Sequence, residues 1–191
     1  MLNKDLILLW IQWCGKWTQA KLLLEKLNNH MYFEMWETLR SLHTNSNLIW
    51  NYMKHCMDSW KMVDNFITND LMDISLKIAE KNNKHLMIDW YPRVAEQTQY
   101  LLPRMQELWR DFIVVHFHLP KEKAIERLLK RAEIQWRKDD NLKSIETRIW
   151  IFINETMLQI QKFESLWKVI TINSENSIQW VFQETCQKLW I

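Results

Sequence analysis

Residues 6–18 read Leu-Ile-Leu-Leu-Trp-Ile-Gln-Trp-Cys-Gly-Lys-Trp-Thr, and this stretch decides the fold. The apolar run 6–9 predicts a buried strand, and the periodic stretch 18–27 predicts a helix that follows it after a turn. The spacing from Trp10 to Gly15-Lys16 is that of a phosphate-binding P-loop. Such a loop turns successive backbone N–H groups around phosphate oxygens, which requires backbone conformations that favour glycine. The following helix N-terminus adds its own donors, so the stretch predicts a phosphate site.

The composition is unusual, because the 191 residues contain thirteen tryptophans and a single glycine. Average glycine usage of about 7% predicts roughly 13 glycines. Tryptophan also stands where glycine is expected: inside the P-loop spacing, and after helical stretches where a C′ glycine is common, as at Trp60 and Trp109. We therefore expect that the gene reads UGA as glycine and that this sequence writes those codons as tryptophan. Nine positions fit glycine well: Trp10, Trp13, Trp17, Trp36, Trp60, Trp90, Trp109, Trp136 and Trp167.

Four tryptophans give no clear signal for glycine: Trp50, Trp150, Trp180 and Trp190. Trp150 and Trp180 lie within helical patterns, where glycine is disfavoured. The alternative interpretation takes every indole literally, as a core anchor or a stacking platform. Core and stacking residues should follow helix faces or alternate along strands, and most of these tryptophans do neither.

Charge and cysteine content exclude several classes of protein. The net charge of +2 is too small for a general nucleic-acid or membrane surface. No secretory signal or transmembrane stretch is visible. Three scattered cysteines form neither a disulfide framework nor a zinc spacing, which fits a reducing compartment. We expect a cytoplasmic monomer that binds neither nucleic acid nor membrane.

Strand and helix patterns alternate along the whole chain, which predicts an α/β fold with a parallel sheet wrapped by helices on both faces. The predicted strands are 6–9, 86–88, 112–117 and 169–172, with a further short element near 31–33. The predicted helices are 18–27, 37–42, 48–59, 65–81, 94–108, 120–131 and 177–189. A further long helix is predicted to begin at a cap formed by Asp139 or Asp140 and to end at about residue 166. No repeat or linker appears, so residues 1–191 are expected to form one domain.

Residues 86–97, Leu-Met-Ile-Asp-Trp-Tyr-Pro-Arg-Val-Ala-Glu-Gln, form the most specific segment. They are similar to the adenylate kinase signature, in which three apolar residues precede Asp-Gly-Tyr-Pro-Arg and a Gln or Asn follows four residues later. Trp90 is the only departure. With these tryptophans read as glycine, the chain resembles a short-lid adenylate kinase along nearly its whole length. The resemblance implies a P-loop three-layer fold with a five-stranded parallel sheet, carrying small AMP-binding and lid insertions.

For the donor nucleotide, the resemblance implies that Lys16 holds the β- and γ-phosphates of ATP. Thr18 and Asp89 would hold Mg²⁺, largely through water. Arg127 would stack on the ATP adenine, and Asn176 falls near the family's last ATP-base contact. The remaining ATP-binding positions are Trp10, Trp13, Cys14, Gly15, Trp17 and Arg131.

For the acceptor nucleotide, the resemblance gives Arg93 the phosphate of AMP and places Trp90 and Tyr91 beside it. Gln97 carries a donor and an acceptor that suit the amino group and ring nitrogen of adenine. Related pyrimidine monophosphate kinases often have Asn at this position, so Gln97 favours AMP. On its chemistry alone, Gln97 could equally be a solvated helix residue.

Two further segments resemble the family's AMP-binding insertion, predicted over residues 34–63. Residues 34–40 are similar to Ser-Thr-Gly-Asp-x-Leu-Arg, with Arg40 as a second arginine on the acceptor phosphate. Met35 replaces the threonine and Glu34 the serine, which removes the hydroxyl groups found there. Residues 58–63 are similar to Asp-x-Gly-x-x-Val, a stretch whose backbone cradles the AMP base. Its acceptor-binding members here are Lys61, Met62 and Val63.

Arginines recur through the last third of the chain, at positions 127, 131, 137 and 148. By themselves they would suggest a solvated basic face, but the resemblance makes them a lid that clamps the transferring phosphate. Arg137 and Arg148 would also contact AMP, and Asp139 and Asp140 would anchor the closed lid, over residues 131–140. The six histidines show no metal-ligand spacing and no cysteine lies between Cys56 and Cys186, so we expect no zinc.

The resemblance implies the reaction Mg·ATP + AMP ⇌ 2 ADP, with ATP and AMP as partners. Phosphoryl transfer would depend on alignment and on positive charge. That charge would come from six side chains: Lys16, Arg93, Arg127, Arg131, Arg137 and Arg148. Two alternatives stay open: a UMP/CMP kinase of the same family, and a catalytically dead Trp-rich binding protein if the tryptophans are real.

Overall fold

The core of the protein is a parallel sheet of five strands. The computed structural model describes residues 2–11, 16–42, 48–58, 62–127 and 142–191. The strands are β1 (Asp5–Trp10), β2 (His30–Glu34), β3 (His85–Asp89), β4 (Phe112–His118) and β5 (Val169–Asn173). They lie in the order β2-β3-β1-β4-β5, and every neighbouring pair is parallel. All five carboxyl ends therefore meet at one edge of the sheet, which confirms the predicted fold class.

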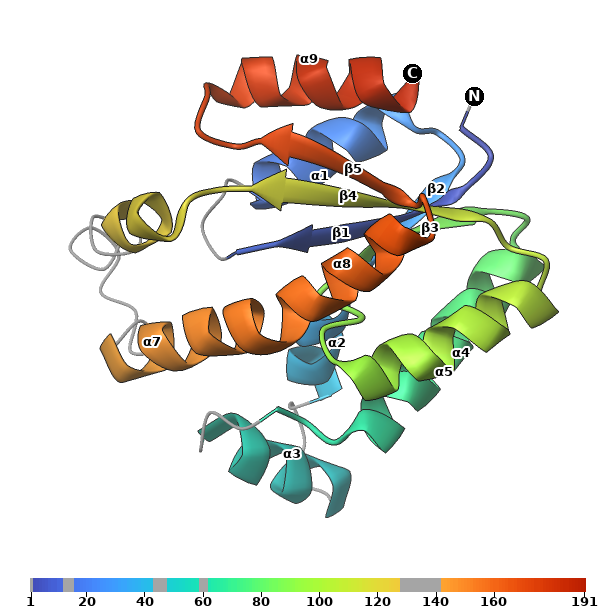
Figure 1. Ribbon diagram of the computed structural model, residues 1–191. Coiled ribbons are helices and arrows are strands. Elements are labelled where there is room, and N and C mark those ends of the chain that lie inside the picture. Colours follow the sequence, from blue (N-terminus) through green and yellow to red (C-terminus); the bar gives the residue numbers. More distant parts are fainter. Residues whose placement is uncertain (1, 12–15, 43–47, 59–61, 128–141) are drawn as a thin grey trace.

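Helices cover both faces of this sheet and complete the three layers (Figure 1). One face carries α1 (Lys16–Lys26) and α9 (Ile178–Leu189), which pack against each other. The other carries α4 (Asn65–Lys81), α5 (Ala95–Glu107) and α8 (Met157–Ser165). All six residues of β1 are buried, as expected for a central parallel strand covered on both faces. None of the helices in the described ranges is both long and apolar enough to cross a bilayer.

Four further helical segments lie near the carboxyl edge or lead to it. β2 is followed by α2 (Met35–Ser41) and α3 (Leu48–Asp58), and β4 by a helical segment at 121–127. The long helix predicted to end near 166 is helical from 142 to 165, but it is not uniform. A π-helical segment, Phe152–Thr156, separates α7 (Leu142–Ile151) from α8. The ring of Phe152 in this segment lies 6.5 Å from the ring of His116.

A buried ion pair joins three strands at the opposite, amino edge of the sheet. Asp5 is fully buried in β1, and its carboxylate accepts hydrogen bonds of 2.8 and 2.7 Å from Arg110. The backbone N–H of Leu86 in β3 donates to the same carboxylate at 2.6 Å. Asp5 directly precedes the apolar run 6–9, and nothing local predicts this pairing. The pair compensates the cost of burying a charge and links β1, β3 and the start of β4.

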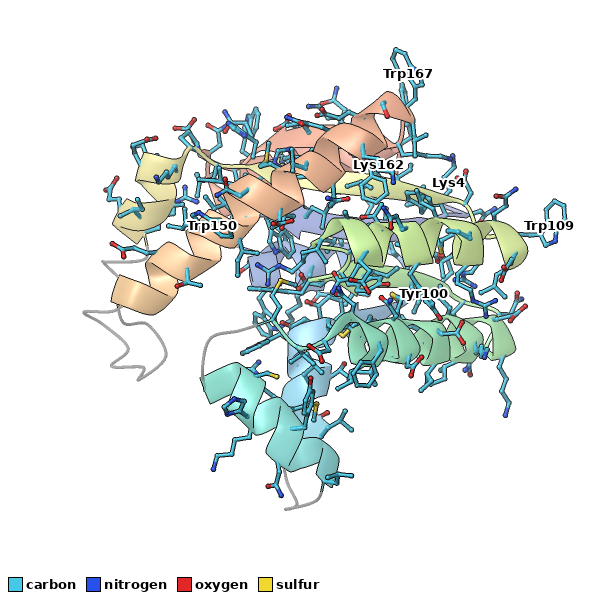
Figure 2. The ribbon with its side chains drawn as sticks, turned by 60° about the horizontal axis from the view of Figure 1, so that its bottom comes forward. Lys4, Tyr100, Trp109, Trp150, Lys162 and Trp167 are labelled. Atoms are coloured by element: carbon cyan, nitrogen blue, oxygen red, sulfur yellow. The ribbon has the colours of Figure 1, made fainter. Side chains whose placement is uncertain are left out.

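Four helices end in the same way, with one residue in the left-handed region. These residues are Asn83, Trp109, Trp167 and Trp190, with φ of 52°, 52°, 57° and 56°. In each case the next N–H donates to the carbonyl five residues earlier, as in a Schellman motif. Glycine usually takes this position, because a Cβ is unfavourable there. The indoles of Trp109, Trp167 and Trp190 are 96%, 95% and 92% exposed, and Figure 2 shows the first two projecting from the helix ends.

His116 on β4 is expected to make the fold sensitive to mild acid. Burial, with a smaller effect of His118, lowers its pKa from 6.5 to about 4. Between these values the unfolded chain takes up a proton that the folded chain does not, so stability is present above pH 6.5 and falls as the pH drops toward 4. We expect a loss of about 2 kcal/mol between pH 7.5 and pH 5 in urea unfolding.

The control separates His116 from other titrating groups. His116→Phe should remove most of this pH dependence, whereas the same loss is expected in His55→Gln, which changes an exposed histidine. An unchanged pH dependence in His116→Phe would contradict the assignment.

Candidate active site

The predicted phosphate loop follows β1, whose carboxyl end lies at the centre of the sheet edge, and precedes α1 in the chain. Trp10 ends β1 and is buried, with its ring 5.2 Å from that of Phe117. Gln12, Trp13, Cys14 and Gly15 lie outside the described residues. Lys16 is the first residue of α1 and Thr18 the third. This places the start of α1, with its free backbone donors, at the end of the central strand, where a phosphate can bind.

Trp17 lies next to this helix start and is 66% exposed. The ammonium group of Lys21 lies 5.8 Å from the centre of its ring. The indole is therefore on the surface, beside the position expected for the nucleotide phosphates, and adds little to the core.

Asp89 ends β3 directly beside β1, where its backbone is paired with Leu8. The side chain is fully buried, and its Oδ2 accepts a hydrogen bond of 2.7 Å from the hydroxyl of Tyr32 on β2. Burial, together with the negative charge of Asp89, raises the pKa of Tyr32 above its ordinary value. Tyr32 therefore stays protonated and acts as a donor, a role that no sequence motif suggested.

The arginine expected to bind the acceptor phosphate is covered by an indole. Trp90 follows Asp89 in the left-handed conformation, with φ of 66°. The guanidinium carbon of Arg93 lies 4.4 Å from the centre of its ring, and Trp36 stacks against the same indole at 6.4 Å. This stack occupies space in front of Arg93 that a glycine at 90 would leave open.

Gln97 is buried at the start of α5 and is held by two protein groups. Its Oε1 accepts from the backbone N–H of Arg93 at 2.8 Å, and its Nε2 donates to the hydroxyl of Thr68 at 3.2 Å. Tyr91, also fully buried, donates to Asn69 at 2.8 Å. An amide can accept twice and donate twice, so Gln97 keeps one lone pair and one N–H for a base. It is an oriented buried residue, which excludes the solvated alternative.

The predicted acceptor insertion is described only in part. Met35 and Val63 are buried, Met62 is half-buried, and Arg40 is exposed. Lys61 lies outside the described residues. Arg40, the phosphate ligand predicted in this segment, is therefore open to solvent.

On the donor side, Arg127 is half-buried and bonds to the loop after β5. It donates to the carbonyl of Ser174 at 3.0 Å and to that of Glu175 at 3.3 Å. Asn176 is the next residue and is exposed. The structure therefore brings Arg127 and Asn176 to one place, as the prediction of a shared adenine site requires. Arg148 lies on α7, and Arg131, Arg137, Asp139 and Asp140 lie outside the described residues.

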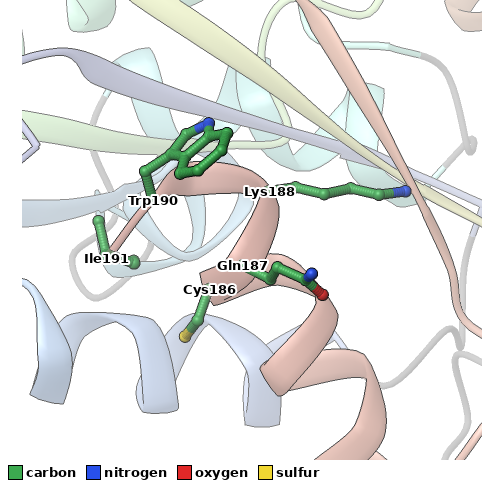
Figure 3. A pocket seen from close by; sticks show the side chains of 5 residues that line it. All are labelled: Cys186, Gln187, Lys188, Trp190 and Ile191. Carbon is green, nitrogen blue, oxygen red and sulfur yellow. The ribbon is translucent and has the colours of Figure 1, made fainter.

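A surface hollow of about 570 Å³ lies at the far end of α9, lined by Cys186, Gln187, Lys188, Trp190 and Ile191 (Figure 3). Since α9 runs back from the end of β5, this end of the helix is remote from the carboxyl edge (Figure 1). One wall is the indole of Trp190, which stands on a left-handed backbone. The hollow is separate from the nucleotide site, and it would lose this wall if residue 190 were glycine.

The arrangement defines a class of protein: a P-loop α/β fold with a buried aspartate on the strand beside the loop. Comparison with known families gives a match over residues 11–168 to the adenylate kinase model. The chain belongs to the adenylate kinase family.

Individual relatives agree with this membership. The chain is 34% identical to adenylate kinase isoenzyme 1 of Caenorhabditis elegans over 66% of this chain and 59% of that protein. It is 28% identical to the adenylate kinase of Prochlorococcus marinus (strain MIT 9515) over 98% of this chain and all of that protein. A uridylate kinase of Saccharomyces cerevisiae is 29% identical over 69% of this chain and 64% of that protein. The chain therefore spans less than two thirds of two of these relatives and the full length of the third.

Proposed function

We propose that this protein is an adenylate kinase that transfers a phosphoryl group from ATP to AMP. The observation that carries the proposal is the placement of Asp89 and Arg93. Asp89 is the last residue of β3, and Arg93 follows four residues later. β3 pairs with β1, the strand that leads into the P-loop spacing. Donor and acceptor phosphates bound at these two places would meet at the carboxyl edge of the sheet.

The side chains have distinct tasks in this reaction. The attacking phosphate oxygen of AMP is already anionic, so no general base is needed. Catalysis consists of aligning the two nucleotides and neutralising charge on a loose transition state. Lys16 and Arg93 would do this from the core, and Arg131, Arg137 and Arg148 from the lid. Arg127 would hold the adenine of ATP through its position beside Ser174 and Asn176.

The donor set fits magnesium. Mg²⁺ prefers oxygen ligands, keeps several of its waters, and binds proteins through one or two carboxylates together with substrate phosphates. Asp89 offers a buried carboxylate at the carboxyl edge, and the hydroxyl of Thr18 lies in the first turn of α1. The metal would neutralise phosphate charge during transfer. No cluster of three or more acidic, histidine or cysteine ligands occurs among the described residues.

We further propose that the active form carries glycine at the nine positions predicted from the sequence, and at 190 as well. Trp90, Trp109, Trp167 and Trp190 have left-handed backbones that favour glycine. Trp10, Trp17 and Trp36 do not have positive φ, so their assignment still rests on the motif spacing. Sequencing the gene tests the proposal directly, because UGA codons support it and UGG codons refute it.

The acceptor base provides a test of the substrate. With glycine at the ten positions, we expect kcat/KM for AMP to exceed that for CMP and UMP by at least about tenfold, since Gln97 is oriented beside Arg93. Initial rates of ADP formation with each acceptor measure this. A higher value for CMP or UMP would instead support a pyrimidine monophosphate kinase; the yeast relative is named a uridylate kinase.

The lid provides a second test, and we propose that it closes through arginine–phosphate contacts without zinc. Only five residues separate Arg131 and Arg137. In the glycine form, a bisubstrate dinucleotide should protect residues 127–148 from hydrogen exchange. A chelator should leave the melting temperature of the nucleotide-free protein unchanged. Stoichiometric zinc, or equal protection without nucleotide, would contradict this proposal. We place the protein in the cytoplasm as a monomer.

A further inference from the structure

Tyr32 is a polar side chain that donates a hydrogen bond to the candidate metal carboxylate, and the P-loop and signature motifs gave it no role. It lies on the edge strand β2, and its ring packs against the hydrophobic core while its hydroxyl reaches Asp89. In the β2–β3 register, Asp89 is opposite Glu34, and Tyr32 is opposite Met87. Tyr32 therefore reaches diagonally along the sheet toward its carboxyl edge, a distance that a long aromatic side chain can span.

We propose that Tyr32 is a positioning residue that holds the Asp89 carboxylate in one orientation for the hydrated metal ion of the ATP complex. This inference rests on the proposed function. The hydrogen bond of 2.7 Å occupies Oδ2, so the carboxylate cannot rotate freely about its last bond. A carboxylate fixed in this way loses less freedom when it orders the waters of the ion. Partners of this kind commonly contribute to metal affinity without touching the metal.

The surroundings of this hydrogen bond make it persistent. Asp89 is fully buried and Tyr32 is half-buried, so water has little access to compete with the hydroxyl. The donor carries no charge, so it restrains the carboxylate without neutralising it. The carboxylate thereby keeps the negative charge that attracts the cation. An arginine or lysine in the place of Tyr32 would cancel that charge.

The test compares Tyr32→Phe with the parent, both in the glycine form. The substitution keeps the ring in the core and removes only the hydroxyl. We expect the affinity of the protein–ATP complex for Mn²⁺, measured by electron paramagnetic resonance, to fall about tenfold. We expect kcat at limiting Mg²⁺ to fall similarly, while KM for AMP stays within about twofold. Tyr100→Phe is the matched control, because it removes another half-buried hydroxyl, from α5, and should change neither quantity.

The outcomes separate the two proposals. Unchanged Mn²⁺ affinity in Tyr32→Phe, with or without a lower melting temperature, would overturn the positioning role and leave the kinase proposal intact. A parent that binds Mn²⁺·ATP but forms no ADP would contradict the proposed function, and the difference in Mn²⁺ affinity would still decide the role of Tyr32.

Discussion

The chain as printed is expected to form no ADP from ATP and AMP, whereas the form with glycine at the ten positions should turn over at least about 10³-fold faster. Indoles at 13 and 17 would fall within the P-loop spacing, where backbone N–H groups must approach phosphate oxygens closely. At the acceptor side, the indole of Trp90 lies on the guanidinium of Arg93 and stacks with Trp36. Both phosphate positions would thus be obstructed.

A coupled assay of ADP formation on both forms measures this difference. An intermediate form with glycine at 109, 167 and 190 serves as the control. It changes helix ends remote from the chemistry, so it should gain stability and stay inactive. If the printed chain forms ADP faster than its Lys16→Met variant, the indoles do not block the site and the proposal is wrong.

The second large effect concerns stability. Replacing Trp109, Trp167 and Trp190 together by glycine should stabilise the printed chain by about 3 kcal/mol, since each left-handed residue with a Cβ costs at least about 1 kcal/mol. The three indoles are more than nine-tenths exposed, so their removal sacrifices almost no buried surface. For a chain of this length we expect the melting temperature to rise by about 6–12 °C.

Two sets of variants check the cause. Alanine at the same three positions also removes the indoles but keeps a Cβ on a left-handed backbone, so it should give little of the gain. Trp180→Gly lies inside α9 and should be destabilising, because glycine within a helix costs about 1 kcal/mol. Equal stabilisation by alanine and glycine would assign the effect to the indoles and not to the backbone.

Local patterns in the sequence were sufficient for the element order and the fold class, and they predict a phosphate loop between β1 and α1. Apolar runs located four of the five strands and a short element at the place of β2, and α4 was predicted with its observed bounds. Trp109 was predicted as a C′ position because the signal is local: a helical period ends, and the next residue must turn the chain. Trp190 gave no clear signal for glycine in the sequence, although it ends α9 with the same left-handed backbone.

Other features depended on which strands, helices and loops are neighbours, and only the tertiary structure decided them. The contacts of Tyr32 with Asp89, Thr68 with Gln97 and Asp5 with Arg110 join residues 57, 29 and 105 positions apart. No spacing in the sequence encodes such a pair, because it forms only when the strand order brings two elements together and the side chains have the reach to meet. The sequence by itself therefore predicted where phosphates bind, while the packed sheet and helices determined which side chains contact the residues predicted to bind them.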